Sequence, residues 1–144
     1  MSPETTILNN YHNVAMVGAS SNEERPSFRV FSYLTRQGYN VIPVNPNEQE
    51  ILGKASYPDL LSIPGKVEVV DIFRKPEQVM PIVDQAIKIG AKAVWMQEGI
   101  VNEEAAARAR DAGLLVVMDK CMRKQLISLK RSKSRRENRQ KNGR

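Results

Sequence analysis

Five short apolar segments, separated by connections long enough to hold a helix, constrain the fold of this chain more than any other feature. Valine occurs in all five segments. The nearly continuous apolar character of the segments is typical of strands buried on both faces of a sheet. Glycine, proline and polar residues mark their ends. The segments are Asn13–Gly18, Tyr39–Val44, Val67–Phe73, Ala91–Gln97 and Leu114–Met118.

Amphipathic stretches with helical spacing lie between most of these segments and after the last one. Asn102 is the expected N-cap of one of them, since acidic residues follow it directly. The connection Asn47–Pro64 is different, and we expect irregular chain there with one helical turn at Asp59–Ser62. The expected helices are Ser27–Gln37, Glu77–Ile89, Asn102–Ala112 and Met122–Leu129.

Strands that alternate with helices form βαβ units, and the crossover connections of such units are right-handed. The 144 residues are enough for one domain of this kind. We therefore predict an α/β fold: a doubly wound parallel sheet of about five strands in a Rossmann-like three-layer sandwich.

The charge of the chain is divided between a mildly acidic body and a basic C-terminal segment. The whole chain carries +6, residues 120–144 carry +10, and the remainder therefore carries −4. From Lys130 onward there is no apolar residue to bury. We expect a folded domain over residues 1–129 and a basic tail over 130–144, which is either disordered or a frayed extension of the last helix. The tail is either a nucleic-acid or anionic-surface arm or simply a solvated segment.

Composition excludes several classes of protein and site. No apolar run approaches the roughly 20 residues that cross a bilayer, and the polar start of the chain is unlike a secretory signal, so we expect a cytoplasmic protein. Cys121 is the single cysteine, which excludes an internal disulfide and a multi-cysteine zinc site. His12 is the single histidine, and we predict a surface position for it and no metal site.

In an open parallel sheet, ligands bind beyond the carboxyl ends of the strands. The loop that follows the first segment leads into a helix whose N-terminus suits a phosphate. Hydroxyl groups and two arginines lie in or near this edge, so we predict a phosphate-bearing ligand. These residues are Ser20, Ser21, Ser27, Arg25 and Arg74.

The common nucleotide motifs are absent. Gly18 is the only glycine of a Gly-x-Gly-x-x-Gly pattern, because Ser20 stands at the second glycine position. Asn45 stands where an acid would hold the adenosine ribose, and no Walker loop is present. Ordinary NAD or NTP binding is therefore disfavoured.

Longer stretches resemble the small stand-alone CoA-binding proteins, whose Rossmann-like domain is similar to the CoA-binding domain of the succinyl-CoA synthetase α subunit. The resemblance covers roughly Val14 to Met122 and leaves out the basic tail. It is carried mainly by Val14–Ser20, Arg25–Ser27, Gly38–Pro46, Val69–Arg74, Gly90–Gln97 and Val117–Cys121.

The resemblance implies that the first loop and the following helix N-terminus receive the CoA diphosphate. It also implies that the segments after the second and third strands flank the adenine and pantetheine. The 3′-phosphate of CoA suits an arginine, and it also accounts for the missing ribose-binding acid. The implied ligand-binding residues are Gly18, Ala19, Ser20, Ser21, Arg25, Ser27, Val44, Asn45, Pro46, Phe73 and Arg74.

Three functions remain open. The first is a non-catalytic module that binds coenzyme A or an acyl-CoA, alone, as a homo-oligomer or with a partner subunit. The second is a nucleotide-dependent enzyme or a CoA-ligase component completed by a partner, and the third is association with nucleic acid through the tail.

The roles of four further residues also remain to be tested. Cys121 either forms a mixed disulfide with CoA or takes part in acyl transfer, or it is a buried apolar side chain. Asp71 and Asp119 are either a polar pair or simple caps, and we expect Trp95 in the core.

Overall fold

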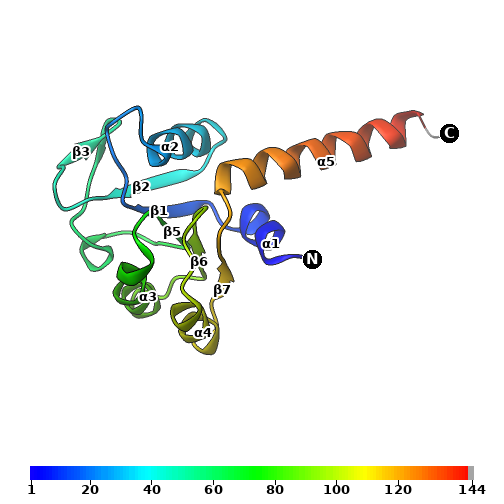
Figure 1. Ribbon diagram of the computed structural model, residues 1–144. Coiled ribbons are helices and arrows are strands. Elements are labelled where there is room, and N and C mark those ends of the chain that lie inside the picture. The colour runs from blue at the N-terminus through cyan, green and yellow to red at the C-terminus, as the bar shows by residue number, and fades with distance from the viewer. Residues whose placement is uncertain (143–144) are drawn as a thin grey trace.

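The five apolar segments form one parallel sheet in the computed structural model, which describes residues 1–142 (Figure 1). The order of the strands in this sheet is β2-β1-β5-β6-β7. The predicted α/β, doubly wound, Rossmann-like fold is therefore confirmed. The strands are β1 (Asn13–Val17), β2 (Asn40–Val44), β5 (Val69–Ile72), β6 (Ala93–Met96) and β7 (Leu115–Val117).

Helices cover both faces of the sheet, and each face has its own apolar core. Alternate strand residues point to opposite faces, so Val14 and Met16 of β1 pack with one set of helices and Ala15 and Val17 with the other. The first set is α1 (Pro3–Asn10), α2 (Pro26–Arg36) and α5 (Met122–Asn142). The second set is α3 (Val79–Lys88) and α4 (Glu103–Asp111), and Figure 1 shows the two layers.

Short elements fill the connections. The predicted turn at 59–62 is the 3-10 helix η1 (Leu60–Ser62), capped by Asp59, and a second one, η2 (Pro76–Gln78), precedes α3. The stretch expected to be irregular also holds a small antiparallel hairpin of β3 (Glu50–Ile51) and β4 (Lys54–Ala55). The expected N-cap of α4 is confirmed, because Asn102 accepts a hydrogen bond from the N–H of Ala105 at 3.0 Å.

The helix α1 is not visible in the sequence pattern. Its stretch is polar except for Ile7 and Leu8, which are adjacent and therefore show no helical periodicity. Ser2 caps the helix by accepting a hydrogen bond from the N–H of Thr5 at 3.2 Å. Both apolar side chains are buried in the core that α1 shares with α2 and α5.

The basic segment continues the last helix beyond Leu129, where that helix was expected to end. Residues 130–142 belong to α5, which projects away from the sheet (Figure 1). The last two residues of the predicted tail, 143 and 144, lie outside the described residues. Within residues 1–142, no helix is both long enough and apolar enough to span a membrane.

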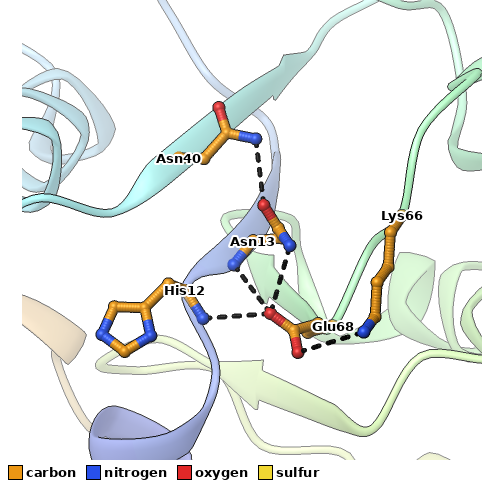
Figure 2. Close-up of polar contacts among 5 residues, drawn as sticks. All are labelled: His12, Asn13, Asn40, Lys66 and Glu68. Atoms are coloured by element: carbon orange, nitrogen blue, oxygen red, sulfur yellow. Dashed lines mark hydrogen bonds and ion pairs between the residues drawn. The ribbon is translucent and has the colours of Figure 1, made fainter.

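The carboxylate of Glu68 joins two segments of chain at the amino-terminal edge of the sheet, which is opposite the expected ligand site (Figure 2). One oxygen of Glu68 accepts hydrogen bonds from the backbone N–H groups of His12 and Asn13, each at 3.1 Å, and from the Asn13 amide at 3.2 Å. The other oxygen lies 3.7 Å from Lys66 Nζ, and Asn40 donates to Asn13 at 3.1 Å. Burial raises the pKa of Glu68, but the hydrogen bonds and Lys66 outweigh it and hold that pKa below its usual value.

Candidate functional site

A cavity of about 520 Å³ opens at the carboxyl edge of the sheet, where the loops after β1, β2 and β5 meet. The chain leaves β1 toward β2 on one side and leaves β5 toward β6 on the other, so the strand order switches between β1 and β5. Open parallel sheets bind ligands at such a switch point. The cavity is lined by Gly18, Ala19, Ser20, Arg25, Ser27, Asn45, Asn47, Phe73, Arg74, Lys75 and Ile100.

This first cavity brings together eight of the eleven residues predicted from the sequence. Val44 and Pro46 line a second cavity of about 410 Å³ instead, which shares Asn47 and Arg74 with the first. Ser21 lines neither of them. It is exposed, and its N–H and hydroxyl groups both donate to the carboxylate of Glu48.

Gly18 allows the end of β1 and the loop after β5 to touch. Its φ is +91°, and a Cβ at this position would lie 2.2 Å from the carbonyl oxygen of Phe73. The Gly18 N–H donates to the carbonyl of Val44 at 3.0 Å, and the Phe73 N–H donates to that of Val17 at 2.8 Å. Gly18 therefore holds three loops together at the cavity wall, because only glycine fits without displacing backbone.

Asn45 fixes the first two loops to each other. Its side-chain amide donates to the carbonyl of Ala19 at 2.8 Å, and its side-chain oxygen accepts from the N–H of Asn47 at 2.8 Å. Ser20 forms a local turn in the same way, by accepting from the N–H of Asn22 at 3.0 Å. The polar side chains here hold the loops as well as face the cavity.

The N-terminus of α2 differs from those of α1 and α4. Ser2 and Asn102 cap those two helices with their side chains, and acidic residues occupy their first turns. At the start of α2, Arg25 is the N-cap residue and makes no capping hydrogen bond within the described residues, and the first turn holds no acid. Because the N–H groups of a first turn lack helical partners, the start of α2 suits an anion.

Three cationic side chains line the same cavity as the start of α2. Arg25, Arg74 and Lys75 line the cavity, and its described lining contains no carboxylate. The sequence analysis did not single out Lys75, although it directly follows two residues that were chosen, Phe73 and Arg74. Ile100 was missed as well, and its signal is its place in the loop after β6, which reaches the same edge.

The second cavity is more apolar. Apolar residues from the end of β2, from η1 and from α3 form much of its wall, and the carboxamides of Gln78 and Gln85 and the carboxylate of Asp59 complete it. Gln85 accepts a hydrogen bond from the N–H of Leu60 at 3.1 Å, which ties α3 to η1. The lining besides the shared Asn47 and Arg74 is Val17, Val44, Pro46, Pro58, Asp59, Leu60, Gln78, Ile82 and Gln85.

Asp71 lies beneath this edge, inside the sheet rather than in either cavity. One of its oxygens accepts a hydrogen bond from the Gln97 side chain at 2.7 Å, and the other has no partner within the described residues. Burial raises the pKa of Asp71 to about 7, against the lowering effect of the Gln97 hydrogen bond. Asp119 instead accepts from the N–H of Gly99 at 2.7 Å, so the two aspartates do not form the polar pair considered above.

The remaining reactive side chains stand apart from the cavities. Cys121 is buried in the apolar core beside α5, which favours the interpretation as a buried side chain. His12 is exposed at the opposite edge, as predicted. Trp95 is in the core, as predicted, and donates to the carbonyl of Lys120 at 2.8 Å. Residues 1–142 contain no group of three or more His, Cys, Asp or Glu that could hold a metal ion.

Known proteins are similar to nearly all of the sheet-forming part of the chain. Residues 12–126 match the family described as CoA binding domain. The uncharacterized protein YneT of Bacillus subtilis is 35% identical over 117 residues, which are 81% of this chain and 87% of that protein. A hypothetical protein from Pyrococcus horikoshii has a solved structure with a TM-score of 0.84 and 46% identity, covering 87% of this chain and 89% of that one.

One further relative is a much larger enzyme. An ADP-forming acetate–CoA ligase II of Archaeoglobus fulgidus is 33% identical over 94 residues, which are 62% of this chain. The matched region is only 14% of the ligase, so the chain spans a small part of that enzyme.

Proposed function

The chain belongs to the CoA binding domain family, and we propose that it binds coenzyme A or an acyl-CoA in the two adjoining cavities without catalysing a reaction by itself. One observation carries this proposal. The uncapped N-terminus of α2 meets a cavity lined by Arg25, Arg74 and Lys75 and, within the described residues, by no acid. An anion with more than one phosphate matches that arrangement.

The two cavities match different parts of CoA, because the first is cationic and suits phosphates, whereas the second is more apolar and suits the adenine or the pantetheine. The diphosphate would lie at the start of α2 and the loop Gly18–Ser20, where backbone N–H groups, hydroxyls and Arg25 are available. The adenine or the pantetheine would occupy the second cavity, against Val44 and Pro46. Arg74 lines both cavities and would contact a phosphate from either side.

The lining of the first cavity favours binding over chemistry. Its described residues supply amides, hydroxyls and cations but no carboxylate, imidazole or thiol that could act as a general base or nucleophile. Asp71 and Cys121 belong to neither lining.

Calorimetric titration with CoA, 3′-dephospho-CoA and NAD tests the proposal. We expect CoA to bind most tightly and Arg74→Ala to weaken its binding by about tenfold or more, since a charge-assisted hydrogen bond is lost. Arg36→Ala is the matched control, because it removes the same charge from α2 outside both cavities. A folded protein that binds NAD but not CoA, or equal weakening by the two variants, would contradict the proposal.

The ligase similarity supports a second candidate, a CoA-binding component that a partner subunit completes. Such a component would still bind CoA alone but would make ATP from acetyl-CoA, ADP and phosphate only when the partner is added. A luciferase assay of ATP formation distinguishes the two candidates. The purified chain is assayed alone and together with lysate fractions from which this chain has been removed. ATP formation that depends on both the fraction and Arg74 would favour the ligase component.

A further inference from the structure

The last turns of α5 form an exposed basic helix that neither cavity explains. We call residues 130–142 the basic helix segment. It contains seven Lys or Arg, one acid, Glu137, and no apolar residue. It leaves the body as a continuous helix (Figure 1), and the side chains of residues 130–141 are exposed except for Ser132, which is partly covered.

The body holds this helix at its base. Met122 and Leu126, in the first turns of α5, are buried in the core with α1 and α2. Lys124 pairs with Glu98 at 2.8 Å, and Lys133 donates to the Asn9 side chain at 2.7 Å. The helix therefore has a fixed root, and the cations beyond Lys133 project into solvent.

The cations of the basic helix segment surround the helix instead of forming one face. At about 100° per residue, the seven positive side chains leave no gap around the axis wider than about 80°. Asn, Gln and Ser side chains and the single acid, Glu137, occupy the positions between them. The cations are Lys130, Arg131, Lys133, Arg135, Arg136, Arg139 and Lys141.

We propose that the basic helix segment binds double-stranded DNA by lying in its major groove. That groove is about 12 Å wide and admits an α-helix, and phosphates line both of its walls. A helix with cations on all sides can meet both walls at once, and its Asn and Gln side chains can reach base edges. Its thirteen residues rise about 20 Å, which is somewhat more than half a helical turn of DNA.

The rest of the molecule determines how the chain would sit on the duplex. The part of the chain before Lys120 carries −4, so phosphates repel it while they attract the segment. A hollow along α5 continues the basic surface back toward the body. Its lining, which combines cations with hydroxyl groups, is Lys124, Ile127, Ser128, Arg131, Ser132 and Arg135.

The same features argue against other polyanions. A helix that inserts into a membrane surface uses an apolar face, and the basic helix segment contains no apolar residue, so only its charge could attract it to an anionic membrane. A flat anionic surface would also meet the cations on one side only. The major groove of double-stranded RNA is deep and too narrow for side chains to read.

Fluorescence anisotropy with a labelled duplex of about two helical turns tests the proposal on the full-length chain. The test variant is Arg135→Gln/Arg136→Gln/Arg139→Gln. The control variant, Lys88→Gln/Lys92→Gln/Arg110→Gln, removes the same charge from exposed positions on the body. Circular dichroism and CoA titration establish that both variants keep the fold and the other site.

We expect binding that weakens steeply between about 50 and about 200 mM salt. The test variant should bind at least about tenfold more weakly and lower the slope of log K against log salt by up to about 2.7. The control variant should change affinity by less than about twofold. Equal weakening by both variants, binding without salt dependence, or tighter binding to double-stranded RNA or to anionic vesicles would overturn the proposal.

Discussion

Replacing Gly18 by alanine should destabilise the protein by two separable effects. The first is conformational, because Gly18 has a φ of +91°, where a non-glycine residue costs about 1–2 kcal/mol. The second is steric, because the new Cβ would lie 2.2 Å from the carbonyl oxygen of Phe73. That oxygen is backbone and cannot rotate away, so the strand end or the loop must move, at about 1–3 kcal/mol.

Gly38→Ala provides the matched control for the steric part. Gly38 has nearly the same φ, +92°, but no described atom lies within 4 Å of the position that its Cβ would take. We therefore expect a loss of about 1–2 kcal/mol for Gly38→Ala and about 2–5 kcal/mol for Gly18→Ala. The difference between the two variants is the cost of the contact with Phe73.

Urea unfolding followed by tryptophan fluorescence measures both losses. Trp95 is the only tryptophan and is buried, so its emission reports the opening of the core. Equal losses in the two variants would refute the argument that Gly18 is required by a close approach. CoA titration adds a second readout, since movement of Phe73 and Arg74 should weaken binding in Gly18→Ala alone.

Two further predictions concern the pH dependence of stability. Since burial raises the pKa of Asp71 to about 7 in the folded protein from an ordinary value of 3.8, the unfolding free energy should fall as pH rises between these values. Urea unfolding at pH 4 and pH 8 should show that Asp71→Asn removes a decline on the order of 4 kcal/mol, and parallel profiles for the two proteins would contradict this. Because the pKa of Glu68 is lowered in the folded state, its stabilisation is present above its usual pKa and is lost as pH falls below it. Glu68→Gln should therefore cost about 2 kcal/mol at pH 7 and much less near pH 3, whereas an equal cost at both would exclude the charge as the cause.

The strands were predictable because burial on both faces of the sheet favours apolar residues at nearly every strand position. Val14–Val17 and Val69–Ile72 are apolar except for Asp71, so their burial is evident from the sequence without periodicity. The hairpin of β3 and β4 was not predictable, since each strand has two residues. The burial of Ile7 was missed because distant segments, and not the neighbours of that residue, create it.

The location of the candidate site was predictable, because the topology of a parallel sheet decides which loops share an edge. Parallel strands deliver their following loops to one edge, so Ser20, Asn45 and Arg74 were expected together before any contact was known. The hydrogen bonds of the loops were not predictable, because they join residues far apart in the sequence. Ser21 donates to Glu48, and the amide of Asn45 is held by Ala19. Contacts of this kind depend on the paths of two loops, which no local pattern contains.

The position of α1 has a consequence for the order in which the chain can fold during synthesis. This helix is synthesised before the strands of the sheet, but the surfaces that bury Ile7 and Leu8 include β7 and α5, which are synthesised after the other strands. The ion pair between Glu4 of this helix and Lys120, at 3.4 Å, likewise forms only after β7, because Lys120 follows that strand. Until β7 and α5 have formed, the core around these two apolar side chains is incomplete. The N-terminal helix therefore gains its full set of contacts only when those two later elements are in place.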